Sequence, residues 1–301
     1  MSEPVVSVRG LTHRFGDVVA LTDLDLDVPA GVTGLVGANG AGKTTLLRVL
    51  LGLVHASAGS ATVMGYEVSA DPIAVRSLVG YMPEGSCIPK DQTAADFVSF
   101  AAELAGVPPK DARRRASETL FLVGLEEERF RYLGDFSTGM QQRVKLAQSI
   151  VHGPRLVLLD EPAAGLDPAG RAQMLSLIRR LGGFGINVIV SSHVLTDIED
   201  TCDSVVMLAA GRLIRAGALS GRSLASTISV EVIERGRDLA DHLASRGFEV
   251  SLAEHTLLVT DPSDDAFDAI RDAAVELSTG ILRLGRSAVT LEDEFLASAD
   301  S

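Results

Sequence analysis

Tryptophan is absent from this sequence, cysteine occurs only twice, and long apolar runs are missing. Cys87 and Cys202 lie in unrelated contexts without metal-ligand spacing, so we expect two reduced thiols. The longest apolar stretch, residues 46–54, is broken by Arg48 and falls far short of the ~18 residues that span a bilayer. The N-terminus MSEPVVSVRG lacks the pattern of a signal peptide. We therefore expect a cytoplasmic chain that does not cross a membrane by itself.

Basic residues are also few: 27 Lys and Arg face 40 Asp and Glu, a formal net charge of −13. An acidic chain without a basic stripe is a poor candidate for binding nucleic acid or anionic lipid, because neutralising phosphates requires clustered Lys and Arg. The run at residues 113–115, Arg-Arg-Arg, is the exception, and we interpret it as the solvated face of a helix. A length of 301 residues suggests about two globular domains.

A glycine-rich stretch stands out in the first quarter of the chain. Residues 32–54, VTGLVGANGAGKTTLLRVLLGLV, predict a strand, a loop and a helix. The spacing from Gly37 to Lys43 and Thr44 fits the phosphate loop G-x-x-x-x-G-K-[ST]. Lys43 would hold the β- and γ-phosphates, and Thr44 would offer a hydroxyl to Mg²⁺. The predicted nucleotide contacts are Gly37, Ala38, Asn39, Gly40, Ala41, Gly42, Lys43, Thr44 and Thr45. The alternative is a glycine-rich turn that happens to contain Lys-Thr.

Two carboxylates follow a second apolar strand. Residues 156–159, LVLL, lead directly into Asp160 and Glu161, which places both acids at the carboxyl edge of a parallel sheet, where ligands bind. We expect Asp160 to hold Mg²⁺ together with Thr44, and Glu161 to act as the general base for an attacking water. Adjacent acids at a strand end could instead be only a preamble to a helix cap.

The surrounding segments predict a mixed α/β domain over residues 1–220. Two or three strands are expected before the phosphate loop, and the alternation in LDLDV indicates a half-exposed antiparallel strand. From Thr93 to about Ile150 the pattern is helical, so we expect a helical subdomain over about residues 85–150. Other expected elements are strands at residues 61–64, 78–82, 187–190, 205–208 and 212–216, and helices at 72–77 and 168–181.

The pattern of predicted elements changes after a predicted linker at residues 217–226. Residues 221–301 predict the order strand, helix, strand, strand, helix, strand, which is the ferredoxin-like arrangement, followed by a short helix at TLEDEFLAS. This segment contains no catalytic constellation. We therefore expect a small α+β accessory domain with a regulatory or partner-contacting role.

Residues 136–143, FSTGMQQR, lie ahead of the Asp160 strand and resemble L-S-G-G-Q-x-Q-R, the signature of ATP-binding cassette (ABC) transporters. With the phosphate loop and the strand-end acids in the same order, residues 4–217 resemble the nucleotide-binding subunit of such a transporter. The resemblance implies a P-loop ATPase with a mixed sheet core and an antiparallel β subdomain, binding ATP and Mg²⁺. It also implies that Ser137 and Gly139 contact the γ-phosphate bound to a second subunit.

The resemblance assigns further residues. Phe15 lies where the family places its adenine-stacking aromatic, although a phenylalanine is more commonly a core residue. Glu84 lies where the family has a glutamine that senses magnesium and water. His193 matches the switch histidine that contacts the γ-phosphate, although a histidine at a strand end is often structural. Residues 164–167, AGLD, resemble the loop that crosses the dimer interface.

The chain also departs from the family pattern. Phe136, Thr138 and Met140 replace Leu, Gly and Gln in the signature, and Glu84 adds negative charge near the expected magnesium. Such departures, with a C-terminal motif like residues 290–296, resemble the branch that exports drugs, ions, polysaccharide or lipid-linked cargo through separate permeases. We therefore expect an ATPase subunit that dimerises on ATP, as a homodimer or heterodimer, and lies at the inner face of the membrane through a permease. The alternatives are a non-transport ABC ATPase acting on ribosomes or DNA, and an importer subunit.

Overall fold

The computed structural model describes residues 3–85, 88–219, 227–253, 256–260 and 265–286. The chain divides into two compact units, Met1–Leu219 and Ser220–Ser301. Each unit has its own buried cluster of apolar side chains. The first unit holds every predicted site residue, so its architecture is described in more detail.

An antiparallel sheet of four strands in the order β2-β1-β4-β5 forms one layer of the first unit. In β2, Leu24, Leu26 and Val28 are buried and alternate with exposed Asp25 and Asp27. This alternation confirms the half-exposed antiparallel strand predicted from LDLDV. The strands are β1 (Val6–Phe15), β2 (Val18–Val28), β4 (Ala58–Val63) and β5 (Tyr66–Glu67).

A sheet of six strands in the order β10-β9-β3-β8-β7-β6 forms the second layer. Its strands are β3 (Val32–Val36), β6 (Val79–Met82), β7 (Leu156–Leu159), β8 (Asn187–Ser192), β9 (Ser204–Ala209) and β10 (Arg212–Ala218). Neighbouring strands from β9 to β6 run parallel, and β10 pairs antiparallel with β9. The carboxyl ends of β3, β7 and β8 therefore meet at one edge of the sheet.

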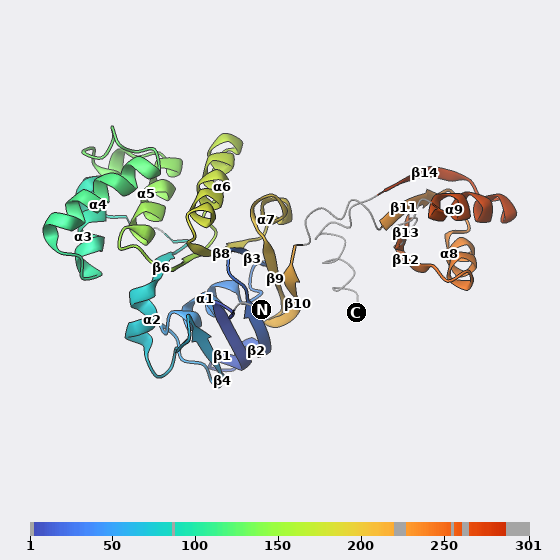
Figure 1. Cartoon of the computed structure of the whole chain (residues 1–301), viewed down its shortest axis with the longest axis horizontal. Helices are drawn as coiled ribbons and strands as arrows, with labels where there is room; N and C mark the ends of the chain where they lie inside the picture. Colours follow the sequence, from blue (N-terminus) through green and yellow to red (C-terminus); the bar gives the residue numbers. More distant parts are fainter. Residues whose placement is uncertain (1–2, 86–87, 220–226, 254–255, 261–264, 287–301) are drawn as a thin grey trace. The chain divides into compact units, whose positions relative to one another are not determined.

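Helices cover both faces of the six-stranded sheet (Figure 1). Leu47 and Leu50 of α1 share one buried cluster with residues of both sheets, so α1 lies between the two layers. On the opposite face, Ile178 of α6 and Ile198 of α7 are buried. These helices are α1 (Lys43–Leu50), α2 (Pro72–Leu78), α5 (Thr138–Ile150), α6 (Pro168–Gly183) and α7 (Leu195–Thr201).

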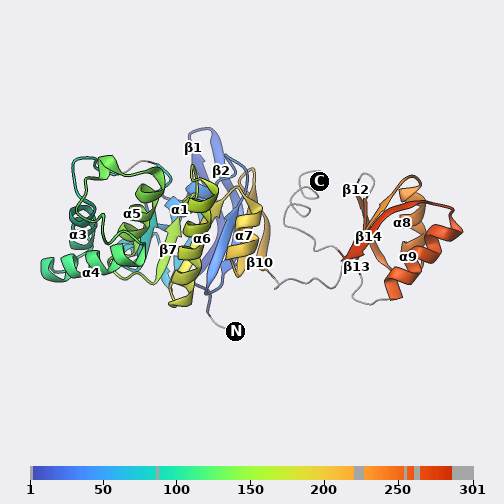
Figure 2. The same cartoon turned by 90° about the horizontal axis from the view of Figure 1, so that it is seen from above.

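The helices that lie between β6 and β7 in the sequence form a group that extends from the sheet, as Figure 2 shows. It contains α3 (Ala94–Leu104), α4 (Pro109–Leu122), the short 3₁₀ helix Leu133–Asp135 and α5. α5 packs against α3 and α4 and also against β6 and β7, so it joins this group to the sheet. The helical pattern predicted between Thr93 and Ile150 is confirmed.

In its described residues, the second unit is an antiparallel sheet with two helices. The strand order is β12-β13-β11-β14, and the predicted sequence of elements is present in the described residues. The ferredoxin-like classification stays a prediction, and the motif at residues 290–296 lies outside the described part. The elements are β11 (Thr227–Val232), α8 (Gly236–Ser245), β12 (Glu249–Ala253), β13 (Thr256–Thr260), α9 (Asp265–Glu276) and β14 (Ile281–Arg286).

Several predicted boundaries need correction; β4, for example, spans Ala58–Val63, where residues 61–64 were predicted. β8 continues beyond Val190 because Ser191 and Ser192 pair with β3. β10 continues to Ala218 because its last residues pair with β9, so the strand takes up the start of the predicted linker. Within the predicted helical stretch, α5 begins at Thr138 because Ser137 caps it. Among the described helices, none combines the length and apolar character needed to cross a bilayer.

Candidate nucleotide-binding and hydrolysis site

The glycine-rich loop joins the end of β3 to the start of α1. A side chain at Gly37 would place a Cβ atom 2.4 Å from the Leu208 carbonyl oxygen, so only glycine fits there. Gly42 has φ of +102° and stands against the Ala20 backbone, where a Cβ would lie 2.8 Å from the carbonyl oxygen. The loop is thus a closely packed turn between β2 and β9, with a conformation that requires glycine.

The first turn of α1 presents uncapped amides to a cavity. The residue before the helix, Gly42, provides no side-chain cap, so the N-terminal N–H groups remain available for an anion. A cavity of about 330 Å³ lies over this turn. Its lining residues are Ala20, Ala38, Asn39, Gly40, Ala41, Gly42, Lys43, Thr44, Thr45, Glu84 and Glu161. All predicted phosphate-loop residues except Gly37 line this one cavity.

Lys43 is buried at the base of the loop. Its Nζ donates to the Gly37 carbonyl at 2.7 Å and lies 3.3 Å from Glu161 Oε1. Only 7% of the residue is exposed, and the ammonium is held by the loop and by the carboxylate of Glu161, which follows β7. A lysine in this place supplies a fixed positive charge at the floor of the cavity.

Asp160 connects three elements. Thr44 Oγ1 donates to Asp160 Oδ1 at 3.2 Å, and Ser191 Oγ donates to the same oxygen at 2.9 Å. The other carboxylate oxygen, Oδ2, is buried without a hydrogen-bond partner. Burial, and after it the negative charge of Asp160, raises the pKa of Tyr81 on β6. The predicted pair of Thr44 and Asp160 is therefore assembled at the edge of the sheet.

Glu161 contacts two other predicted site residues. Its Oε2 lies 2.9 Å from His193 Nδ1, and its Oε1 lies 3.3 Å from Lys43 Nζ. The residue is 8% exposed and has φ of +50°, a left-handed conformation that is uncommon outside glycine. Its backbone N–H donates to Ser191 Oγ at 2.9 Å. Residues predicted from three separate motifs thus meet around one carboxylate.

Ser191 belongs to this cluster but was not among the predicted site residues. Its hydroxyl donates to Asp160 and accepts from the Glu161 N–H, so it fixes both acids. The side chain is fully buried at the end of β8. The available signal in the sequence was a polar residue at the end of an apolar strand, two positions before His193. A single serine gives no indication from sequence of which way it faces, and the parallel pairing with β3 decides that.

Glu84 and Phe15 stand in different positions relative to the cavity. Glu84 lines it, and its carbonyl oxygen accepts from Lys145 Nζ of α5 at 3.0 Å. Phe15 ends β1, is 49% exposed and is not among the residues that line the cavity; its ring meets the His13 ring at 4.4 Å. The adenine-stacking role of Phe15 stays a prediction.

Ser137 and Gly139 lie at the start of α5, away from the phosphate cavity of the same chain. Ser137 Oγ accepts from the Met140 N–H at 3.3 Å and caps the helix. The neighbouring loop after β7 approaches this point, since a Cβ at Gly139 would lie 3.8 Å from Leu166 Cδ2. Asp167 ends that loop by capping α6. The two expected phosphate clamps are therefore separate sites within one chain.

A phosphate loop after β3, two acids after β7 and a histidine after β8 define the class of P-loop nucleotide-hydrolysing proteins. The sequence model described as "ABC transporter" matches residues 21–164. An ABC transporter ATP-binding protein from Synechocystis is 33% identical, over 93% of this chain and 78% of that protein, and one solved structure gives the same family. The chain belongs to the ABC transporter family, as an ATP-binding subunit with the ATPase cassette fold.

The similarities extend beyond the matched segment. A Nod factor export ATP-binding protein from Burkholderia lata is 33% identical, over 97% of this chain and 95% of that protein. A daunorubicin resistance ATP-binding protein from Streptomyces coeruleorubidus is 31% identical, over 97% of this chain and 92% of that one. The structure of CbiO1 from Clostridium perfringens, part of the ABC transporter complex CbiONQ, aligns with a TM-score of 0.66 and 26% identity. The alignment covers 72% of this chain and 89% of CbiO1.

Proposed function

We propose that this chain hydrolyses ATP in a two-fold dimer to drive export through a separately encoded permease. The observation that carries the proposal is the meeting of Lys43, Asp160, Glu161 and His193 at one edge of the six-stranded sheet. The first unit is the ATP-binding domain, and the second is an accessory domain. The chain lies at the inner face of the membrane through its permease.

The phosphate loop binds the triphosphate. Uncapped N–H groups of the first turn of α1 point at an anion, and Lys43 adds a positive charge beneath them. Lys43 Nζ contacts two carbonyl oxygens and Glu161, and phosphate oxygens would compete with these groups for its protons. The loop selects a polyanion by geometry and charge, while adenine stacking is assigned to Phe15.

The residues around Asp160 fit a magnesium ion. Asp160 Oδ2 is buried and unpartnered, and the Thr44 hydroxyl lies beside the other oxygen; Mg²⁺ prefers such oxygen ligands. Within the described residues no cluster of three or more acidic, histidine or cysteine side chains is able to hold a metal alone. The ion would therefore take its remaining ligands from phosphate and water, with Glu84 nearby, and would neutralise phosphate charge.

Glu161 takes the proton in hydrolysis. A water oxygen attacks the γ-phosphorus, Glu161 accepts a proton from that water, and the bond from the γ-phosphorus to the bridging oxygen breaks. His193, 2.9 Å from the carboxylate, orients Glu161 and the attacking water. Ser137 and Gly139 of a second subunit complete the site at the γ-phosphate, which supports a dimer closed by ATP.

Export is the direction that the relatives favour. The aligned daunorubicin resistance and Nod factor export proteins cover nearly the whole chain, including the second unit. A ribosome- or DNA-acting ATPase is the competing class, and the net charge of −13 argues against it. An importer subunit differs only in its permease.

The test joins the enzyme to its partner. The full chain is co-expressed with a several-span membrane protein encoded beside it, and copurification and Mg²⁺-dependent ATPase activity are measured. We expect a stable complex with faster hydrolysis than the free subunit. Copurification of ribosomal RNA or DNA in place of the membrane protein would overturn the transport proposal. EDTA is the control for the metal, and it should abolish turnover.

A further inference from the structure

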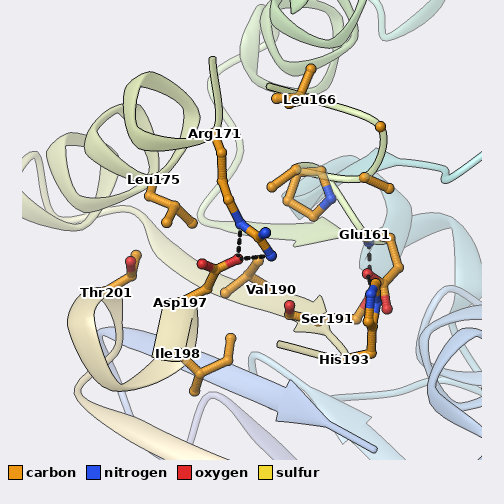
Figure 3. A pocket seen from close by; sticks show the side chains of 15 residues that line it. Glu161, Leu166, Arg171, Leu175, Val190, Ser191, His193, Asp197, Ile198 and Thr201 are labelled. Carbon is orange, nitrogen blue, oxygen red and sulfur yellow. Dashed lines mark hydrogen bonds and ion pairs between the residues drawn. The ribbon is translucent and has the colours of Figure 1, made fainter. Parts of the chain in front are cut away.

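A partly buried ion pair joins α6 and α7, the two helices that follow the loops of Glu161 and His193. Arg171 Nε of α6 donates to Asp197 Oδ2 of α7 at 2.8 Å, and Arg171 Nη2 lies 2.7 Å from the same oxygen. Figure 3 shows the two side chains facing each other across the pocket. The Asp197 side chain is 9% exposed, against 35% for Arg171. A carboxylate this buried is costly to leave without its cation, so the pair holds α6 and α7 together at this point.

Arg171 and Asp197 each follow, by four residues, a residue of a loop that leads from the proposed catalytic site. Arg171 stands four residues after Asp167, the cap that ends the loop from Glu161. Asp197 stands four residues after His193. Both side chains line a cavity of about 100 Å³ whose wall also includes Glu161 and His193. The ion pair therefore links the two segments that deliver the base and the histidine.

Little else in the described residues fixes the histidine. The His193 side chain is 52% exposed, and its Nδ1 lies 2.9 Å from Glu161 Oε2. α7 has only seven residues, and Val194 before it provides no side-chain cap. His193 lies between β8, which ends at Ser192, and α7, which packs against β3, β8 and α6. The Arg171–Asp197 pair is a polar link between α6 and α7 and so contributes to the position of His193.

We propose that Arg171 and Asp197 are positioning residues for ATP hydrolysis that act by aligning His193 with Glu161. The proposal rests on the roles given to those two residues under the proposed function. Neither Arg171 nor Asp197 lines the phosphate cavity. Loss of the pair should therefore lower turnover and leave ATP binding intact.

The experiment compares Asp197→Asn, Arg171→Gln and the double variant in the full chain. We expect each single change to lower kcat roughly tenfold to a hundredfold, because small misplacements of reacting groups are costly. The Kd for a fluorescent ATP analogue should change by less than about twofold, since the phosphate loop is untouched. The double variant should resemble the slower single variant, because both changes remove one shared link. Arg171→Lys keeps the cation and should recover part of kcat.

A matched control uses an ion pair away from the site. Arg114 of α4 contacts Asp111 and Glu118, all more than half exposed, and Arg114→Gln should leave kcat and Kd unchanged. Thermal melting reports folding of every variant. If Asp197→Asn fails to fold, Arg171→Gln decides: a lower kcat with unchanged Kd supports the proposal, and an unchanged kcat overturns it.

The possible results distinguish failure of the positioning role from failure of the proposed ATPase function. A wild-type chain without ATPase activity contradicts the proposed function itself. An active wild type with normal kcat in folded Asp197→Asn overturns only the positioning role. Parallel losses in kcat and in ATP affinity also overturn it, because they would mean that the pair supports the whole site. Additive losses in the double variant would show two unconnected effects.

Discussion

Glu161 combines two unfavourable features at the scale of the single residue. Its backbone is left-handed, and its carboxylate is almost fully buried. Contacts with Lys43, His193 and Ser191 offset both costs. Strained residues of this kind persist where the surroundings hold them, and they concentrate at functional sites.

Glu161→Gln tests the general base. The amide keeps the size of the side chain but accepts a proton poorly, so we expect kcat to fall by about 10²–10⁴-fold. ATP affinity should be retained, because the phosphate loop is intact. Turnover is measured by phosphate release, with Glu103→Gln on the surface of α3 as the control. Wild-type turnover in Glu161→Gln would remove Glu161 from the mechanism.

Lys43→Ala tests the phosphate contact. The buried ammonium is the charge at the floor of the cavity, so its loss should weaken ATP binding roughly a hundredfold, in line with ~3 kcal/mol for a hydrogen bond to a charged group. Fluorescent-ATP titration measures this. Lys110→Ala, an exposed position on α4, is the matched control. Equal affinities in the two variants would contradict the role of Lys43.

Ser191→Ala tests the residue that the sequence did not reveal. The change removes one hydrogen bond to Asp160 and one to the Glu161 backbone, both buried, and should lower the free energy of unfolding by about 1–3 kcal/mol. It should also raise the Mg²⁺ concentration needed for half-maximal turnover, since Asp160 loses an anchor. Urea unfolding and a magnesium titration measure the two effects. Normal values in both assays would show that Ser191 contributes neither to stability nor to the magnesium requirement.

At the scale of elements, the start of α5 performs two tasks. Ser137 caps the helix, and under the proposed function it also contacts the nucleotide of the partner subunit. Ser137→Ala should therefore cost about 1 kcal/mol of stability as a lost cap and should lower hydrolysis as well. The ATP affinity of dilute monomer should stay nearly unchanged, because the contact is made in trans.

Thr93 provides the comparison for this prediction. It caps α3 through the Asp96 N–H and lies outside the proposed site, so Thr93→Ala should lose similar stability and keep its hydrolysis rate. Chemical denaturation and ATPase assays on both variants separate the two tasks. A large loss of ATP affinity in monomeric Ser137→Ala would mean that Ser137 acts within its own chain.

The sequence predicted elements well where a period was strong and less well where pairing decides the boundary. LDLDV and the helical stretch from Thr93 were correctly assigned, because amphipathic periodicity is local. Ser191 and Ser192 lack strand character and join β8 only because β3 pairs with them. The contacts among Lys43, Glu161 and His193 followed from motif order, since parallel strands end at one edge. The distances between these residues, and the hydrogen bonds of Ser191 to Asp160 and Glu161, depend on packing between segments that are distant in the sequence. Local sequence patterns therefore do not predict them.

At the scale of the whole molecule, the proposed dimer is the main expectation. Glu161→Gln with saturating ATP and Mg²⁺ should roughly double its mass in light scattering, because uncleaved nucleotide bridges two chains, each contributing one clamp. Without nucleotide the same variant should remain monomeric. Lys43→Ala is the negative control, since it should not bind ATP. A monomer with ATP, also in the presence of the permease, would contradict the dimer.

The place of β3 in the six-stranded sheet has a consequence for synthesis of the chain. The neighbours of β3 in the sheet, β8 at residues 187–192 and β9 at residues 204–209, come about 150 and about 170 residues later in the chain. A nascent polypeptide that has emerged only through its phosphate loop has no partner on either side of that strand. Translation must therefore pass Ala209 before the loop acquires its support, and ribosome-bound fragments shorter than this should fail to retain nucleotide.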